Sequence, residues 1–227
     1  MPVTTHQRKA KPFTINQWFL VSCSFSYFLL CGRVAATGYL TYVFLLWNLF
    51  LAFIPFLVSC FLSVNIRIIN NKWLLGSALL LWLLFIPNSF YILTDLVHLI
   101  YIQSAPKWFD LLLLLSFAWN GLLFGIASVR KIEVILLHIY GRSFSLAIIF
   151  LVMWLNALGI YVGRFLRYNS WDIVAQPFSL FSDLFNILAS PFSNSMEWIM
   201  ISAYAVFMTL LYVSVRKLAE SFHHLKN

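Results

Sequence analysis

Apolar positions along this chain gather into six long runs, separated by short polar segments. The runs are 15–31, 39–62, one beginning at Trp73, 109–129, 143–163 and 196–215. About 20 apolar residues in a helix cross the hydrocarbon core of a bilayer. The pattern therefore predicts an all-α integral membrane bundle of six transmembrane helices over residues 15–215. Residues 1–14 and 216–227 are predicted to be basic segments on the cytoplasmic side.

The third run reaches Pro87 after only fifteen residues, and a polar stretch that contains Asn88, Thr94, Asp95 and His98 follows it. Fifteen helical residues rise about 22 Å, which is less than the roughly 30 Å hydrocarbon core. Two structures fit this pattern. Either the helix continues with a kink through Pro87 to about residue 93, or it stops there and Asn88 or Thr94 caps a new helix.

The composition also predicts that much of the surface of the protein faces lipid. The chain is 62% hydrophobic and 10% charged, with a mean hydropathy of +0.88, whereas soluble domains keep about a quarter of their residues charged. The net charge of +8 needs no nucleic-acid partner, since no polar domain exists to carry such a surface. Cys23, Cys31 and Cys60 have no paired spacing, so we expect neither a disulfide framework nor a metal or cofactor site.

Lysine and arginine are divided unequally between the two sets of loops. One set has four: Arg33, Lys107, Arg164 and Arg167. The other has eleven: Arg8, Lys9, Lys11, Arg67, Lys72, Arg130, Lys131, Arg142, Arg216, Lys217 and Lys226. Basic loops stay in the cytoplasm, where they meet anionic lipids. This bias predicts both termini inside and the polar stretch after Pro87 on the outer face.

The first apolar run allows two interpretations. The first run, with its basic front, could be a signal peptide cleaved near residues 34–36, but Arg33 beside that position favours an uncleaved span. Residues 130–142 are predicted to be a basic cytoplasmic loop.

The longest loop, residues 164–195, contains a short amphipathic pattern from Pro177 to Leu188. Its apolar residues recur at helical spacing, and Pro177 suits a first turn. We expect a helix that lies flat in the headgroup layer.

Polar residues from two separated blocks are predicted to meet on the outer face. Arg164 and Arg167 would bind an anion, and Asp172 would hold one of these arginines. Asp95 and His98, three residues apart, would act as base and orienting group if the site is catalytic. The other candidate ligand-binding residues are Asn88, Tyr91, Thr94, Asn156 and Asn169.

Each feature also has a purely structural explanation. Thr94 and Asp95 could simply cap a helix joint, and the arginines could reach lipid headgroups or pair with Asp95 or Asp172. Asn48 and Asn120 are typical of hydrogen bonds between membrane helices. Two pairs of small residues permit close approach of neighbouring helices, namely Gly121 with Gly125 and Gly159 with Gly163.

The two blocks together resemble a known family. Residues 87–98 follow the pattern P-N-x-x-Y-x-x-T-D-x-x-H, and residues 159–172 follow G-x-x-x-G-R-x-x-R-x-N-x-W-D. Both are similar to domain of unknown function 1361, an uncharacterised family of bacterial multi-pass membrane proteins. Phe90 stands where that family often has proline. The resemblance implies a protein of the bacterial cytoplasmic membrane and brings no activity, substrate or catalytic residue.

Three classes of function remain open from the sequence. The first is an outer-face polar cleft for an anionic envelope ligand, lipid-linked or free, with or without enzymatic chemistry. The second is a small transporter, since a proline-interrupted span is typical of transport sites. The third is a non-catalytic assembly or scaffold protein, in which the arginine and aspartate side chains satisfy one another and leave no cavity.

Overall fold

The computed structural model of this protein describes residues 14–101, 104–168 and 172–224, and its regular structure in these ranges is entirely helical. The long helices are α1 (Ile15–Thr37), α2 (Phe44–Val64), α4 (Lys72–Tyr91), α6 (Lys107–Tyr140), α7 (Arg142–Arg164) and α10 (Ser195–His224). The shorter elements are α3 (Ile66–Ile69), the 3₁₀ helix η1 (Ile92–Val97), α5 (His98–Tyr101), α8 (Asp172–Ala175) and α9 (Pro177–Ala189). The predicted all-α fold is confirmed.

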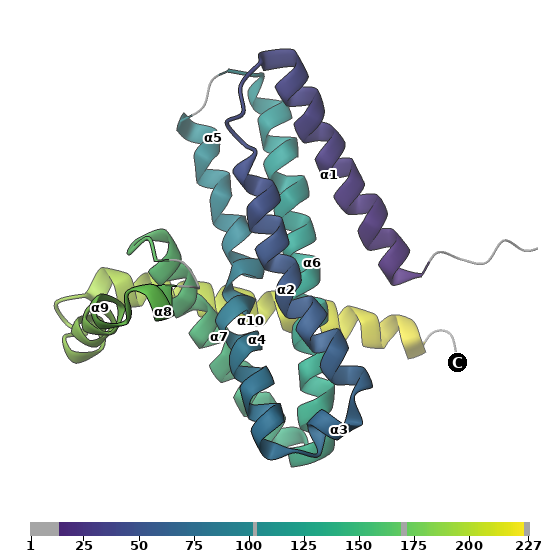
Figure 1. Cartoon of the computed structure of the whole chain (residues 1–227), viewed down its shortest axis with the longest axis vertical. Coiled ribbons are helices and arrows are strands. Elements are labelled where there is room, and N and C mark those ends of the chain that lie inside the picture. Colours follow the sequence, from purple (N-terminus) through teal and green to yellow (C-terminus); the bar gives the residue numbers. More distant parts are fainter. Residues whose placement is uncertain (1–13, 102–103, 169–171, 225–227) are drawn as a thin grey trace, which may run out of the picture.

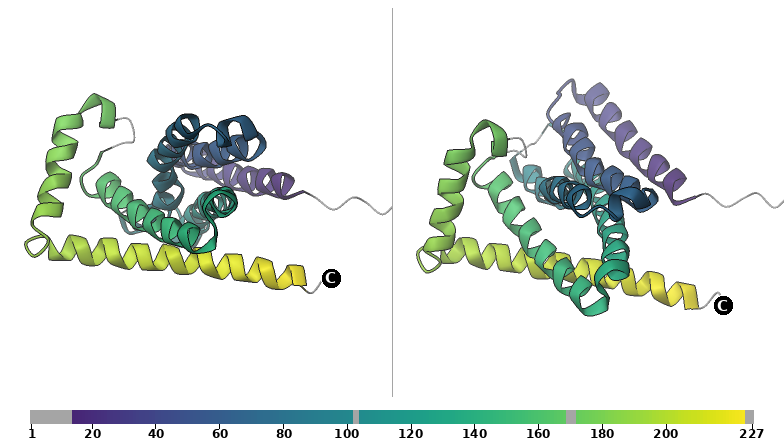
Figure 2. Two further views of the ribbon diagram at one scale, coloured as in Figure 1. Left: turned by 90° about the horizontal axis from the view of Figure 1, so that it is seen from below. Right: turned by 60° about the horizontal axis from the view of Figure 1, so that its bottom comes forward.

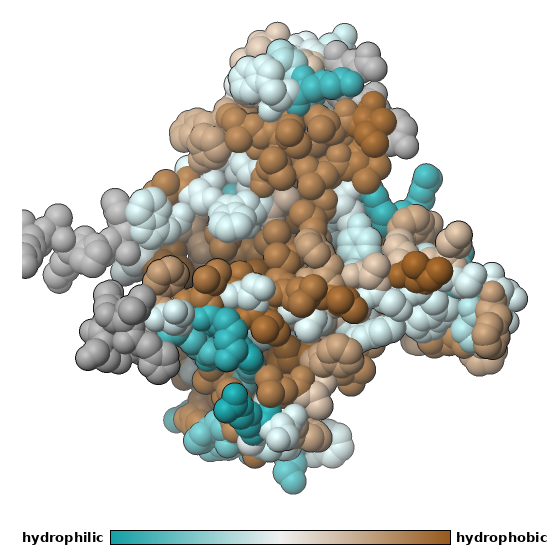
Figure 3. All heavy atoms as spheres, turned by 180° about the vertical axis from the view of Figure 1, so that it is seen from behind, coloured by the Kyte–Doolittle hydropathy of each residue, from teal (hydrophilic) through white to brown (hydrophobic). Residues whose placement is uncertain are grey.

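Six helical units within the described ranges are long and apolar enough to cross a membrane. One of them, Lys72–Ile100, combines α4, η1 and part of α5. A large share of the apolar side chains in these units faces outward, and the resulting hydrophobic surface is broad (Figure 3). This surface is what a lipid environment requires, so the prediction of a six-helix membrane protein is confirmed.

Helices α2, α4 and α6 run side by side along the long axis of the molecule, and α1 packs against α6 (Figure 1). Helix α7 leans away from this axis and packs against α4, α6 and α10. Helix α10 runs across the bundle rather than along it, as the views in Figure 1 and Figure 2 agree. Its main partner is α7, and it contacts α6 only over a short region.

Polar bonds join the helices near Pro55, which lies inside α2 and has no backbone N–H to donate. The Ser89 hydroxyl donates to the Ala52 carbonyl at 2.8 Å. The Ser128 hydroxyl donates to the Pro55 carbonyl at 2.8 Å and accepts from Trp82 Nε1 at 2.7 Å. In an apolar medium such bonds have no competing water. They therefore join α4 and α6 to α2 in the turn around Pro55.

The prediction of a loop over residues 130–142 is wrong. Helix α6 continues without interruption to Tyr140, and only Gly141, with a φ of 79°, separates it from α7. Ile132, Ile135 and Leu136 are buried, so the apolar face of the helix passes straight through the basic segment. Charge density suggested a loop, but helical periodicity decides the structure here. Helix α10 likewise continues past Val215 to His224.

The amphipathic helix predicted from Pro177 to Leu188 is present as α9, which ends at Ala189 and has Pro177 in its first turn. Its apolar residues serve two surfaces. Leu180 and Ile187 are buried against the protein, whereas Phe181 and Phe185 are exposed. Helix α9 thus covers the bundle with one side and offers aromatic rings to its surroundings with another.

Candidate functional site

The polar stretch after Pro87 forms a continuous helical joint rather than a break. Helix α4 passes through Pro87 to Tyr91 and tightens into η1, which carries the chain to Val97. Asn88 is therefore inside α4, where its Nδ2 donates to the Phe85 carbonyl at 3.0 Å. The Thr94 hydroxyl donates to the Tyr91 carbonyl at 2.6 Å. Of the two structures that the sequence allowed, the continuous helix is present, and neither side chain is an N-cap.

Two glycine pairs enclose this joint from opposite sides. A Cβ added to Gly121 of α6 would lie 2.9 Å from the Ser89 carbonyl oxygen, and one added to Gly159 of α7 would lie 2.7 Å from Pro87 Cγ. Tyr91 meets Gly163 in the same way, at 3.3 Å. Real side chains do not tolerate the first two separations, so the absence of a side chain lets α4 sit between α6 and α7. The close approach predicted for both glycine pairs is confirmed.

Asp95 is the centre of a buried polar cluster. It accepts from Asn48 Nδ2 at 2.8 Å and lies 3.4 Å from Arg164 Nη1, so that α2, η1 and α7 all contribute to the cluster. Arg164 also donates from Nη2 to the Thr94 carbonyl at 3.0 Å. The Asp95 side chain is 2% exposed, whereas Arg164 keeps 19% of its surface open. The carboxylate and the carbonyl together orient a guanidinium that remains partly exposed.

His98 lies at the edge of the same cluster. Its Nε2 is 4.0 Å from Asp95 Oδ1 and 3.4 Å from Arg164 Nη1, and its ring packs edge-on against Phe44. A separation of 4.0 Å is within reach of an ion pair but beyond hydrogen bonding. The sequence correctly predicted that Asp95 and His98 are neighbours. In this geometry Asp95 bonds Asn48 rather than the imidazole.

A cavity of about 370 Å³ opens beside this cluster, between α2, α4 and α7, with α9 over it. Most of its lining is aliphatic, including Leu51, Leu83 and Leu158. Leu180 and Leu184 of α9 cover it. The polar side chains in its wall are those of Asn48, Asn88, Tyr91 and Tyr168. Among the described lining residues none is charged, and Asn48 and Tyr91 connect the cavity wall to Asp95 and Arg164.

The other predicted site residues are distributed differently. Asn156 is fully buried in α7 with no partner for its Oδ1, and it is not among the cavity-lining residues. Arg167 is exposed, with a left-handed φ of 61°, and Asp172 begins α8 with its side chain half-buried. Asn169 lies outside the described residues. The structure therefore brings Asn88, Tyr91, Thr94, Asp95, His98 and Arg164 together and leaves Asn156 apart.

The profile of a protein family of unknown function, DUF1361, matches residues 47–211. The chain belongs to this family. The match begins at Trp47 and so includes Asn48, the cavity, the Asp95 cluster and α9. Searches of curated proteins and of solved structures gave no match. Family membership thus agrees with the resemblance carried by residues 87–98 and 159–172 and assigns no activity.

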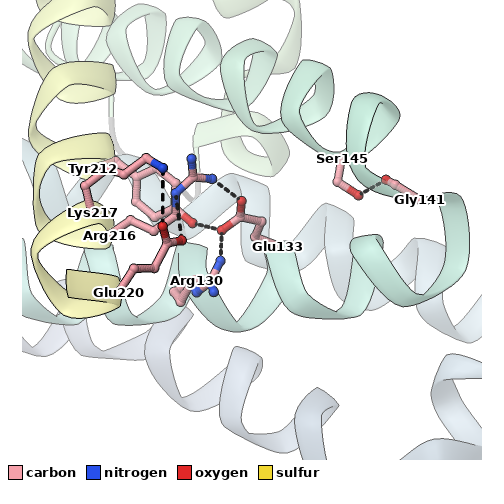
Figure 4. Close-up of polar contacts among 8 residues, drawn as sticks. All are labelled: Arg130, Glu133, Gly141, Ser145, Tyr212, Arg216, Lys217 and Glu220. Carbon is pink, nitrogen blue, oxygen red and sulfur yellow. Dashed lines mark hydrogen bonds and ion pairs between the residues drawn. The ribbon is translucent and has the colours of Figure 1, made fainter. Parts of the chain in front are cut away.

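A second polar cluster, around Glu133, lies near the far end of α6, and the sequence analysis did not predict it (Figure 4). Glu133 is 1% exposed. It accepts from Arg130 at 2.5 Å, from Arg216 at 2.6 Å and from the Tyr212 hydroxyl. Tyr212 and Arg216 come from α10, so this cluster fastens α10 to α6. The available signal was Glu133 itself, an acidic residue flanked by isoleucine and valine within a basic segment.

A third cluster joins α1 to the start of α6. Arg33 Nε donates to Asp110 Oδ1 at 2.7 Å, and Arg33 Nη2 donates to Ser104 at 2.8 Å. The guanidinium stacks over the Tyr42 ring at 4.4 Å. Burial, reinforced by Asp110, raises the pKa of the Tyr42 phenol to about 12, so its hydroxyl stays protonated. The bonds that Arg33 makes show that it is a structural residue of this helix end.

Proposed function

We propose that this protein binds an anionic amphiphile of the membrane in the cavity beneath α9. The apolar chain of the ligand occupies the cavity, and its anionic head lies at Arg164 and Arg167. The observation that carries the proposal is the aliphatic cavity, whose wall residue Asn48 donates to Asp95, the carboxylate that also holds Arg164.

Charge supports this placement of the head. Arg164 has one carboxylate partner but remains 19% exposed, so a second anion can approach its guanidinium. Arg167 is exposed, and it makes no hydrogen bond or ion pair within the described residues. The left-handed backbone at Arg167 is uncommon for a residue with a side chain and is often found at functional sites. Arg164 follows the lining residue Gly163, and Arg167 precedes the lining residue Tyr168. Two arginines at these positions suit a phosphate or carboxylate head.

Asp95 acts here as a positioning residue. It is buried, does not line the cavity, and is held by Asn48 and Arg164. A carboxylate in this setting fixes the arginine that meets the ligand. Asn88 and Tyr91, which do line the cavity, orient the segment of the ligand between head and chain.

The cavity lining favours binding over the two other classes of function. A transport path for ions or charged solutes needs polar groups along its length, and no described lining residue of this cavity is charged. A scaffold with mutually satisfied ion pairs has no use for an open cavity. In the clusters at Glu133 and Arg33, buried carboxylates pair with arginines, so these two clusters have the scaffold-like character instead.

Two ligands that share a chain and differ in the head provide the test. Farnesyl phosphate and farnesol are titrated onto the protein in nanodiscs, and binding is followed by native mass spectrometry. We expect farnesyl phosphate to bind at least about tenfold more tightly, because two arginines meet its charge. Arg167→Gln weakens that preference, whereas Lys107→Gln, the matched control, does not. Equal binding of phosphate and alcohol, or equal effects of the two variants, contradicts the proposal.

The site also fits an outer-face location in a bacterial cytoplasmic membrane. The distribution of lysine and arginine supports a topology with both termini in the cytoplasm. Reporter fusions after residue 72 and after residue 168 check this assignment. The first is expected to report the cytoplasm and the second the outer side, and the reverse result places the cavity on the inner face.

A further inference from the structure

A second cavity lies further along the same helices. It has a volume of about 380 Å³ and is formed by α4, α6 and α7. Its lining is apolar and aromatic and includes Leu79, Trp82, Ile132, Phe144, Ile148 and Val152. No described lining residue is charged, and Tyr140 marks its far end. Nothing in this lining would hold an ionic head, so the cavity suits a hydrocarbon chain alone.

The two cavities meet at Leu83, which lines both. They also share one face of α7. Phe144, Ile148 and Val152 line the second cavity, and Leu155, Gly159 and Val162 line the first. These positions are separated by three or four residues, so they form a single helical stripe. The two cavities therefore follow one another along α7 and adjoin at Leu83 of α4. This α7 stripe, with its two cavities, is the seam.

The length of the seam determines what can fill it. From Phe144 to Gly163 the helix rises about 28 Å, whereas one leaflet contributes only about half of a roughly 30 Å hydrocarbon core. The fatty acyl chain of an ordinary phospholipid is matched to one leaflet. A ligand that fills the seam needs one anionic head and one apolar chain of roughly twice that length.

We infer that the ligand is a long-chain polyprenyl phosphate. Its head lies at Arg164 and Arg167, and its chain passes Leu83 into the second cavity, as far as Tyr140. This inference rests on the proposed function and specifies the substrate class. Isoprenoid chains are unusual among membrane lipids in exceeding the length of one leaflet, and their branched methyl groups suit a seam lined with leucine, isoleucine and aromatic rings.

Chain length is the variable to test. Undecaprenyl phosphate and farnesyl phosphate have the same head and the same chain chemistry, and they are compared on the full-length protein in nanodiscs by native mass spectrometry. We expect undecaprenyl phosphate to bind at least about tenfold more tightly, because every further buried methylene or methyl group adds to the affinity. Phosphatidic acid, an anionic lipid with acyl chains of one-leaflet length, is expected to bind no better than farnesyl phosphate.

A substitution in the second cavity tests where the extra chain lies. Ile148→Trp fills that cavity without touching Arg164, and Leu151→Trp places the same ring on an exposed position of α7 that lines neither cavity. Ile148→Trp is expected to reduce undecaprenyl phosphate binding to the level of farnesyl phosphate, which itself is unaffected. Leu151→Trp is expected to change neither. Thermal unfolding of both variants verifies that they are folded.

The possible results separate the two proposals. Equal binding of the two polyprenyl phosphates, or tighter binding of phosphatidic acid, overturns the chain-length inference and leaves the binding of an anionic amphiphile standing. Failure of all three ligands to bind overturns both proposals. A chain-length preference that survives Ile148→Trp overturns the assignment of the second cavity to the chain. A stable dimer that closes the seam, seen in the same spectra, also overturns the inference.

Discussion

Gly159 of α7 lies directly against the ring of Pro87 in α4, and this contact sets the distance between the two helices that carry the candidate site. A Cβ at Gly159 would lie 2.7 Å and 2.8 Å from the Cγ and Cβ atoms of Pro87. Pro87 cannot yield easily, because its ring is rigid and sits inside a helix. The cavity beside this contact and the position of Arg164, five residues further along α7, both depend on it.

Gly159→Ala is therefore expected to destabilise the protein by about 1–3 kcal/mol through overpacking. Gly76→Ala is the matched control, because it is also a helical glycine but nothing lies within 4 Å of its added Cβ. The control is expected to stabilise the protein by about 0.5–1 kcal/mol, as alanine does relative to glycine inside a helix. Thermal unfolding in detergent measures both. Equal effects of the two substitutions would show that the close contact between Gly159 and Pro87 does not affect stability.

Much of this arrangement could be predicted from sequence. Uninterrupted apolar runs predict membrane helices reliably, because a backbone in lipid must satisfy its hydrogen bonds internally. The small-residue pairs on α6 and α7 also marked the correct contacts. The sequence could not decide whether α4 continues through Pro87. That outcome depends on how α4 packs between α6 and α7, where Gly121 and Gly159 leave room for the residues around Pro87.

The polar clusters were predicted less well, and for different reasons. Asp95 and Arg164 are 69 residues apart, and their pairing was one of two that the sequence allowed. The interhelical bonds predicted for Asn48 and Asn120 are confirmed, to Asp95 and to Ser26 respectively. Glu133 was missed because charge density suggested a solvated loop. Only the packing of α10, which no local pattern encodes, shows that this carboxylate is buried.

The Glu133 cluster is expected to be among the strongest attachments of α10. Glu133→Gln leaves Arg216, whose side chain is only 14% exposed, without its buried carboxylate partner. Breaking a buried ion pair in this way lowers the free energy of unfolding by about 3–5 kcal/mol. Glu220→Gln, which affects an exposed partner of the same arginine, is expected to cost less than about 1 kcal/mol. Limited proteolysis and thermal unfolding compare the two variants, and similar stabilities would show that the cluster does not hold α10.

The pair of Arg33 and Asp110 offers a double-mutant cycle. Asp110→Leu alone leaves a buried guanidinium without its ion-pair partner, and Arg33→Met alone does the same to a buried carboxylate. Each is expected to lower the free energy of unfolding by about 3–5 kcal/mol. Replacing both removes the two charges together, so the double variant is expected to be more stable than either single variant. Unfolding free energies of the four proteins measure the coupling. Strictly additive losses would contradict a direct interaction between the two side chains.

The bond between Tyr168 and α9 is expected to control ligand exchange. The Tyr168 hydroxyl donates to Asp183 Oδ2 at 2.9 Å. Tyr168 lines the cavity, and Asp183 lies on α9 between the lining residues Leu180 and Leu184. Tyr168→Phe removes about 1 kcal/mol of hydrogen bonding. We expect farnesyl phosphate to dissociate about fivefold faster. Tyr39→Phe, at an exposed and distant tyrosine, serves as the control. An unchanged dissociation rate in Tyr168→Phe would mean that α9 does not retain the ligand.

The most direct test of the account is to find where an anionic amphiphile binds on the folded protein. Farnesyl phosphate that carries a photoreactive benzophenone on its chain is crosslinked to the protein in nanodiscs, and the labelled residues are identified by peptide mass spectrometry. Labels are expected on the cavity segments of α4, α7 and α9, around Leu83, Leu158 and Leu184, and an excess of unlabelled farnesyl phosphate is expected to remove them. Labelling spread evenly over exposed apolar residues such as Leu20 and Phe28 of α1, with no competition by the unlabelled compound, would contradict the account.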